Sequence, residues 1–125
     1  MVTLVVPDYD EAIAFFVGKL GFHLVADRRE SETKRWVEVA GDSGLRLLLA
    51  QAASPEQAAA IGNQTGGRVG FFLYTDDFAA THAAMLGKGV EFSSEPRHEV
   101  YGSVAVFTDV AGNRWDLIQL AGTTQ

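Results

Sequence analysis

The sequence predicts an α+β domain built from two βαβββ repeats. An apolar strand, a capped helix and three further strands follow one another in the same order twice along the 125 residues. Asp8 and Asp77 precede the two helices as N-cap residues. Gly44 and Gly112 stand in equivalent turns, and the separation of such pairs stays at 68 or 69 residues. This regular offset indicates an internal repeat, which determines the whole architecture.

The elements of the first half follow from local patterns. Residues 2–6 are β-branched and apolar, which is typical of a strand. Asp8 and Glu11 form a capping box for the helix that follows, and Gly21 ends that helix. Three further strands are expected over residues 23–26, 35–40 and 45–50, with a hairpin turn at 41–44.

The second half repeats this order. Residues 69–75 predict a strand, Asp77 caps a helix, and Gly87 and Gly89 end it. Three strands are expected over residues 90–93, 103–108 and 114–120, with a turn at 109–113. We therefore expect one domain over residues 1–125, with repeat one at about 1–50, a linker at 51–67, repeat two at about 68–120, and a frayed tail at 121–125.

Composition limits the class of function. The net charge is −6 and the pI is near 4.9, and no segment concentrates Lys and Arg, so no nucleic-acid partner is expected. No apolar run is long enough to cross a bilayer, so no membrane partner is expected. The chain has no cysteine, which excludes disulfides and thiolate metal ligands. No secretory leader pattern precedes the first strand, and we expect a cytoplasmic protein.

Two segments carry a family resemblance. The segments VVPDYDEA at residues 5–12 and KLGF at 19–22 resemble the first repeat of the glyoxalase/bleomycin resistance protein/dioxygenase superfamily, which has the vicinal oxygen chelate fold. The segment DVAGNRWDL at 109–117 resembles its closing motif, in which a proline usually stands at the position of Val110. The resemblance implies an eight-stranded, open, cup-shaped mixed sheet with helices on the outer faces. It is specific for the fold and nearly silent on the reaction.

The resemblance also implies where a metal would be held. In metal-dependent members, His and Glu from the first and last strands of each repeat hold a divalent ion that acts as a Lewis acid. Carried onto this sequence, those positions fall at Met1, Leu48, Gly70 and Asp116. Only Asp116 offers a hard oxygen ligand. We therefore predict no metal site and no cofactor, and a divalent metal is the alternative.

Strand alternation predicts which side chains line the cup, because residues two apart face the same side. Ligand-binding positions are expected at Thr3, Arg46, Leu48, Phe72, Tyr74, Arg114 and Asp116, and at Tyr101 near the cavity mouth, where similar proteins often carry Tyr-Gly. Arg46 or Arg114 could hold a ligand carboxylate or phosphate. Each could equally pair with Asp116, or with a partner such as Glu38.

The catalytic residues, if any exist, are not fixed by the sequence. The candidates are Asp116, Tyr101 and His98. Asp116 and Tyr101 could do metal-free acid–base work, and Asp116 with His98 or Glu38 could form a rearranged metal site. His23 and His82 are expected at the surface or at a helix edge. Trp115 is expected in the core, because it points away from the face that carries Asp116.

Three functions remain open at this level. The first is a metal-free protein that binds a small, partly aromatic or anionic molecule in the cup. The second is a lyase, isomerase or dioxygenase that uses a rearranged metal site or acid–base chemistry. The third is a structural or regulatory module without a ligand. Since members of this family usually assemble as homodimers, some by pairing repeats across chains, we expect a homodimer.

Overall fold

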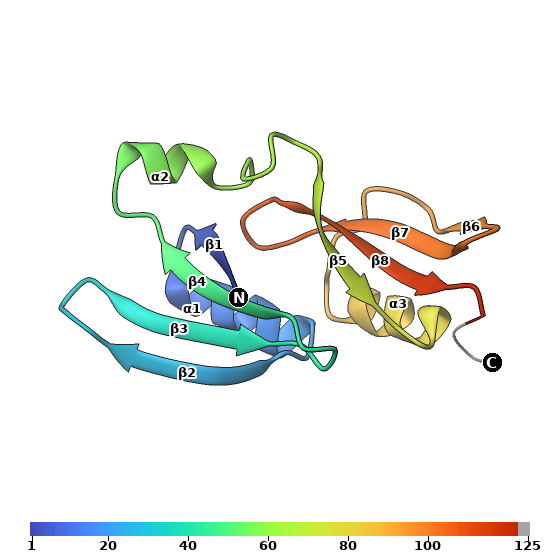
Figure 1. Ribbon diagram of the computed structural model, residues 1–125, viewed down its shortest axis with the longest axis horizontal. Helices are drawn as coiled ribbons and strands as arrows, with labels where there is room; N and C mark the ends of the chain where they lie inside the picture. Colours follow the sequence, from blue (N-terminus) through green and yellow to red (C-terminus); the bar gives the residue numbers. More distant parts are fainter. Residues whose placement is uncertain (123–125) are drawn as a thin grey trace.

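Two four-stranded mixed sheets carry the eight strands (Figure 1). The computed structural model describes residues 1–122, so residues 123–125 of the expected tail lie outside the described part. The first sheet has the order β1-β4-β3-β2, with β1 Val2–Val6, β2 His23–Arg29, β3 Arg35–Ala40 and β4 Arg46–Gln51. The second has the order β5-β8-β7-β6, with β5 Val69–Tyr74, β6 Arg97–Glu99, β7 Gly102–Thr108 and β8 Arg114–Leu120. The predicted fold of two βαβββ repeats is confirmed, because β1 pairs in parallel with β4 and β5 pairs in parallel with β8.

Each repeat contributes one helical segment to the core. Repeat one has α1 (Tyr9–Ile13), which continues into the π-helical segment η1 (Ala14–Lys19), and repeat two has α3 (Phe78–Gly87). The predicted N-caps are confirmed, since the Asp8 and Asp77 carboxylates accept hydrogen bonds from the backbone N–H groups three residues later. A short helix, α2 (Pro55–Ala60), lies in the linker. None of the helices in residues 1–122 is long and apolar enough to span a membrane.

The helix of repeat one differs from the regular helix that the sequence predicts. Its last turn is widened, and the Leu20 N–H donates to the Phe15 carbonyl five residues earlier. Two adjacent aromatic side chains, Phe15 and Phe16, are both buried there. Local spacing alone does not predict this widened turn.

One short strand of repeat two lies elsewhere than expected. The sequence predicts it at residues 90–93, but within that segment only Phe92 pairs, in an isolated bridge with Phe107. The strand that pairs with β7 is β6, at Arg97–Glu99, in a segment expected to be a loop. The prediction was wrong because the apolar residues of 90–93 face the core without forming a continuous ladder, whereas β6 is exposed and polar.

One buried core joins the two repeats. Leu4 and Leu47 of the first sheet and Trp115 and Leu117 of the second are fully buried in the same cluster. The ring centroid of Phe16 in η1 lies 5.8 Å from that of Trp115, so the helical segment of repeat one packs against the sheet of repeat two. The predicted core position of Trp115 is confirmed. Burial of this kind contributes most of the folding free energy.

The turn before β8 is held by one buried carboxylate. Asp109 accepts hydrogen bonds from the backbone N–H groups of Ala111 and Asn113, at 2.9 and 3.0 Å. It also accepts one from the Trp115 indole Nε1–H at 2.9 Å. A buried carboxylate needs such donors, because its water is lost on folding. The family-like motif at 109–113 therefore has a structural role, which is to hold the Trp115 ring in the core.

A second contact recurs in both repeats. The Gln51 side chain at the end of β4 accepts from the Tyr9 N–H at 3.1 Å, and Gln119 in β8 accepts from the Phe78 N–H at 2.7 Å. In each case the last strand satisfies a free N–H in the first turn of its own helix. The contact supports the repeat relationship independently of the glycine turns.

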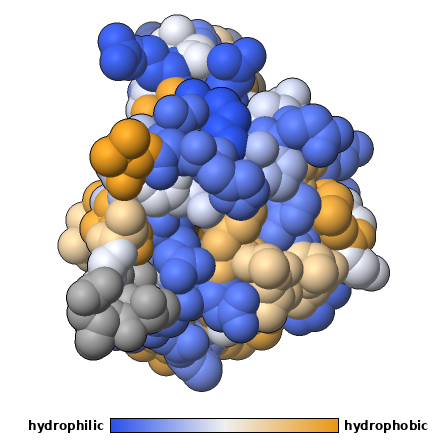
Figure 2. Space-filling view, turned by 90° about the vertical axis from the view of Figure 1, so that its right-hand side faces the viewer, coloured by the Kyte–Doolittle hydropathy of each residue, from blue (hydrophilic) through white to orange (hydrophobic). Residues whose placement is uncertain are grey.

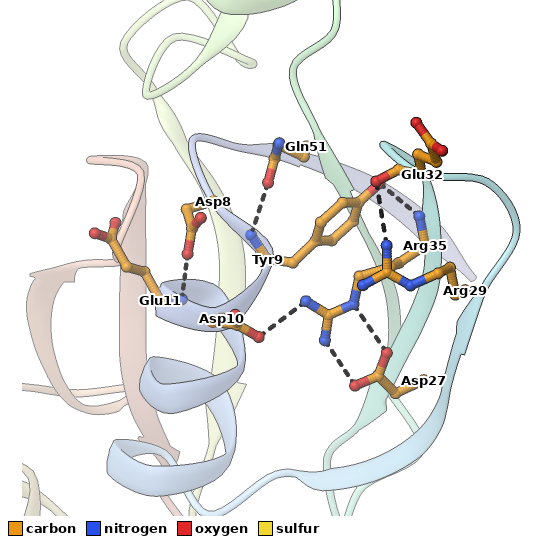
Figure 3. Close-up of polar contacts among 9 residues, drawn as sticks. All are labelled: Asp8, Tyr9, Asp10, Glu11, Asp27, Arg29, Glu32, Arg35 and Gln51. Carbon is orange, nitrogen blue, oxygen red and sulfur yellow. Dashed lines mark hydrogen bonds and ion pairs between the residues drawn. The ribbon is translucent and has the colours of Figure 1, made fainter.

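A charged cluster ties helix α1 to the outer hairpin of the first sheet (Figure 3). The Arg35 guanidinium donates to both carboxylate oxygens of Asp27, at 3.1 and 2.7 Å, and to Asp10 at 2.9 Å. It lies 5.2 Å from the centroid of the Tyr9 ring. The hydrogen bonds from Arg35 hold the pKa of Asp27 below its usual value. Arg35 is thus committed to intramolecular partners.

Removing the Asp109 carboxylate tests the role of the turn. We expect Asp109→Ala to lower the free energy of unfolding by about 3 kcal/mol, because the Trp115 and Asn113 donors lose their buried acceptor. The matched control is Asp42→Ala, which removes an exposed carboxylate whose partner is the equally exposed His23. Urea unfolding monitored by tryptophan fluorescence measures both. Equal stability of the two variants would contradict the assigned role.

Candidate functional site

The two faces of each sheet differ in chemistry. Along β1, Leu4 and Val6 are buried in the core, whereas Thr3 and Val5 point the other way and remain partly exposed. We call the side of each sheet that faces away from the core its cup face. The helix-facing sides of both sheets share one core, so both cup faces lie on the outside of it. The candidate site consists of these two faces.

The cup face of the first sheet contains a paired carboxylate. Thr3 and Glu38 flank Leu48 in one row across β1, β4 and β3. The Glu38 side chain is only 12% exposed, and its Oε2 lies 2.7 Å from Nη2 of Arg46. Of the alternatives for Arg46, the structure shows the pair with Glu38. Such a pair removes much of the cost of placing a charge on a half-buried face.

Trp36 lies beside this pair. Its indole Nε1–H is 3.4 Å from the other Glu38 oxygen, and the Arg28 guanidinium lies 5.3 Å from its ring centroid. Arg28 and Trp36 are cross-strand partners in β2 and β3, so they share the cup face. An aromatic ring held in this way offers a flat surface with few rotamers left to lose on binding.

A hollow of about 740 Å³ opens at this end of the first sheet. It is lined by Trp36, Leu48 and Ala50 of the sheet, by Lys34 of the β2–β3 hairpin and by Gln57 of α2. We call it the sheet-one hollow. Its volume is in the range of small-molecule sites, which combine apolar walls with a few polar groups.

The cup face of the second sheet is aromatic and acidic. Phe72 pairs with Asp116, and Tyr74 pairs with Ile118, between β5 and β8. Phe72 and Tyr74 are 49% and 53% exposed, which is unusual for side chains of this size. The structure thus brings Phe72, Tyr74 and Asp116 together, while Arg114 lies exposed at the start of β8.

Asp116 is electrostatically perturbed. Burial raises the pKa of its carboxyl group above the usual value, and the positive charge of Arg97 lowers it by a smaller amount. The carboxyl group therefore holds a proton more readily than an exposed aspartate does. This is the property expected of a group that works as an acid or contacts a ligand.

The two repeats carry their carboxylates on different strands. In repeat one, Glu38 on β3 lies opposite Leu48 on β4, whereas in repeat two Asp116 on β8 lies opposite Val106 on β7. The equivalent cross-strand row of each repeat therefore contains one carboxylate, on a different strand in each case. Sequence reasoning singled out Asp116 and considered Glu38 as a pairing partner or as a ligand in a rearranged metal site, because the register of the third strand was not fixed.

The four family metal positions do not assemble a donor set. Met1, Leu48 and Gly70 offer no hard oxygen or imidazole ligand, and a Cβ at Gly70 would overlap the Thr65 side chain. Within residues 1–122, no three His, Cys, Asp or Glu side chains are grouped so that they could hold a metal ion. The residues present do not fit the divalent ion that the fold family implies.

Two of the catalytic candidates lie apart from Asp116. Tyr101 is in the β6–β7 turn beside Gly102, which pairs with Leu120, four residues or about 13 Å along β8 from Asp116. His98 accompanies Ser103, with 2.8 Å between Nδ1 and Oγ, and its ring lies near Phe78 of α3. It therefore points to the helix side. The three candidates do not form one acid–base group.

The outer edge of β1 is covered by the linker. The Gln64 side chain accepts from the Val5 N–H at 3.0 Å and donates to the Thr3 carbonyl at 2.6 Å. These are the backbone groups that a neighbouring strand would use. Sequence reasoning did not predict this contact, since the linker carries no periodic signal.

The family model that matches the chain is described as "Glyoxalase/Bleomycin resistance protein/Dioxygenase superfamily" and covers residues 1–117. An uncharacterized protein of Shewanella frigidimarina (strain NCIMB 400) is 52% identical over 122 residues, which is 95% of this chain and 90% of that protein. The protein YetH of Bacillus subtilis (strain 168), also uncharacterized, is 27% identical over 90% of this chain and 89% of its own.

Solved structures agree with this assignment. UcmS2 is 31% identical, with a TM-score of 0.80 over 94% of this chain and 93% of its own. TnmS3, described as an antibiotic binding protein from Streptomyces sp. CB03234, is 29% identical with a TM-score of 0.75, over 96% and 93%. A glyoxalase/bleomycin resistance protein from the same strain is 30% identical with a TM-score of 0.72, over 94% and 96%.

Neutralising Asp116 tests its environment. The pKa of Asp116 is higher in the folded protein than in the unfolded chain, so the protonated carboxyl group stabilises the fold. This stabilisation is present at acid pH and is lost as the pH rises through the pKa of the folded state. We expect Asp116→Asn to melt at a higher temperature than the wild type at pH 7 and at a similar temperature below pH 3.8. Calorimetry at both pH values measures this. Exposed Asp76→Asn is the matched control, and a gain at pH 7 shared by both variants would contradict the assignment.

Proposed function

Because the chain belongs to the glyoxalase/bleomycin resistance protein/dioxygenase superfamily, we propose that it binds a small, partly aromatic or anionic molecule on its cup faces without a metal ion. The observation that carries the proposal is that the half-exposed Phe72 and Tyr74, and the less exposed Trp36, lie beside charged groups on faces where only Asp116 remains as a hard metal donor. Without a ligand, exposure of the Trp36, Phe72 and Tyr74 rings to water costs free energy.

The chemistry of the donor positions supports metal-free binding. A hard divalent ion needs several oxygen or imidazole ligands, and a methionine, a leucine and a glycine supply none of them. The nearest carboxylate on the first sheet, Glu38, is already paired with Arg46. A ligand would therefore be held by contact with the aromatic rings and by hydrogen bonds.

One relative supports the class of ligand. TnmS3 is described as an antibiotic binding protein, and its structure matches nearly the whole chain at 29% identity. Antibiotics that bind in clefts commonly present apolar and aromatic surface together with a few polar groups, which is the combination on these cup faces. The natural ligand of this chain would share that chemistry.

We also propose that the working form is a cytoplasmic homodimer. Both cup faces lie outside the shared core, so a second copy could cover the face that one chain leaves open. The end of the molecule that carries β6 and α3 shows separate apolar patches among polar side chains rather than one apolar surface (Figure 2). Light scattering is expected to give twice the 13.5 kDa mass of the chain, and a mass of one chain would contradict the dimer.

Asp116 favours a second candidate function. Its raised pKa and its place between Phe72 and Val106 would suit a general acid in a lyase or isomerase. Such chemistry needs a second group to receive the proton, and neither Tyr101 nor His98 lies beside the carboxylate. We therefore rank binding above catalysis.

Binding of a neutral aromatic probe tests the proposal. N-phenylnaphthylamine fluoresces when it leaves water, and we expect saturable binding that is unchanged by EDTA. Trp36→Ala should weaken it about tenfold, because the ring supplies stacking and apolar contact. Leu86→Ala, which shortens an exposed side chain on α3, is the control and should have no effect.

Two results would contradict metal-free binding. The first is the absence of saturable fluorescence in the wild-type protein. The second is binding that disappears with EDTA and returns with a divalent ion.

A further inference from the structure

We propose that the sheet-one hollow selects aromatic anions, with the aryl group against Trp36 and the negative charge held by Lys34 and Arg28. The inference rests on the proposed binding function and specifies the ligand class for one part of that site. The inference depends on which charged side chains around the hollow already have an ion-pair partner and which do not.

The hollow is lined by cations and not by carboxylates. Among the described residues that line it, the charged ones are Lys34 and Arg35. Glu30 and Glu32, in the same hairpin as Lys34, do not line it. Glu38, which lies beside Trp36, does not line the hollow either, and its charge is paired with Arg46. An anion in the hollow would therefore meet positive charge at its wall.

The two lining cations differ in availability. Arg35 forms ion pairs with Asp27 at 2.7 Å and with Asp10 at 2.9 Å, so its charge is already neutralised within the fold. In the part of the chain that the structure describes, no carboxylate lies within ion-pair distance of the Lys34 ammonium group. The Lys34 backbone N–H donates a hydrogen bond to the Ser31 Oγ at 3.0 Å, which holds the Lys34 backbone in place. Lys34 is thus an anchored residue with a free charge.

Arg28 does not line the hollow, but it lies over the Trp36 ring that does, and it supplies a second cation there. Its guanidinium lies 5.3 Å from the Trp36 ring centroid, and no ion pair to it is found within residues 1–122. Since Arg28 and Trp36 face each other across β2 and β3, the cation stays on the cup face. A ligand whose ring rests near Trp36 could direct an acidic substituent toward Arg28 or Lys34, and guanidinium groups bind carboxylate, sulfonate and phosphate oxygens in pairs.

The second sheet has the opposite character near its aromatic residues. Phe72 and Tyr74 lie beside the Asp116 carboxyl group, which Arg97 offsets only in part. An acidic substituent would therefore be held less well beside Asp116 than at the sheet-one hollow.

The test compares two probes that differ only by a sulfonate group. Anilinonaphthalene sulfonate carries a negative charge, and N-phenylnaphthylamine is its neutral counterpart. We expect the sulfonate to bind the wild-type protein more tightly, and Lys34→Gln and Arg28→Gln each to weaken its binding about fivefold, as expected for loss of one charge contact near water. Binding of the neutral probe should change much less than binding of the sulfonate, because the neutral probe has no charge for either cation to hold. Added salt should weaken only the sulfonate.

Lys88→Gln is the matched control, because it removes one positive charge beyond α3 and should leave both probes unaffected. Equal affinity of the wild-type protein for the two probes overturns the inference. It is also overturned if Lys34→Gln and Arg28→Gln both leave sulfonate binding unchanged. In either case the neutral probe still binds, so the proposed function stands. Failure of both probes to bind overturns the proposed function and this inference together.

Discussion

The burial of the helix-facing sides of both sheets in a single core is the constraint on which the rest of the structure depends. At its centre is Trp115, whose ring centroid lies 4.9 Å from that of Phe71 and 5.7 Å from that of Phe107, and whose N–H is bound by Asp109. Because side chains alternate between the two faces of a strand, the position of Trp115 determines which face its neighbours occupy. Asp116, one position along β8, must face away from the core.

The functional surface follows from this constraint. The same alternation turns Thr3 and Leu48 of the first sheet and Phe72 of the second away from the core. An apolar residue on such a face costs free energy unless something covers it. The candidate site is therefore the set of side chains that the core cannot accommodate. Its charges are either paired, as with Glu38 and Arg46, or free, as with Lys34.

The sequence predicted the parts of the fold that local chemistry controls. The caps at Asp8 and Asp77, the equivalent turns at Gly44 and Gly112, and the alternation in β1, β4, β5 and β8 are all present. Both turn glycines have φ near +98°, a conformation that other residues adopt only with strain. These features depend on residues close together in the chain, which is why they can be recognised without a structure.

Features that depend on distant contacts were not predictable. The strand at Arg97–Glu99 is exposed and polar, so only its pairing with β7 identifies it. The row that joins Glu38 to Leu48 depends on the register of β3, and the Gln64 contact depends on how the linker returns to β1. For the site, the sequence predicted the lining from the first and last strands of each repeat and left the third strand, with Trp36 and Glu38, undetermined.

The most direct measurement follows the two tryptophans, one on the cup face and one in the core. A nitrogen-15 correlation spectrum resolves the two indole N–H signals while N-phenylnaphthylamine is added. If the cup face binds aromatic molecules, the Trp36 signal moves and saturates with the probe, and the Trp115 signal stays in place. Movement of the Trp115 signal alone, or of neither signal, would contradict binding at the cup face.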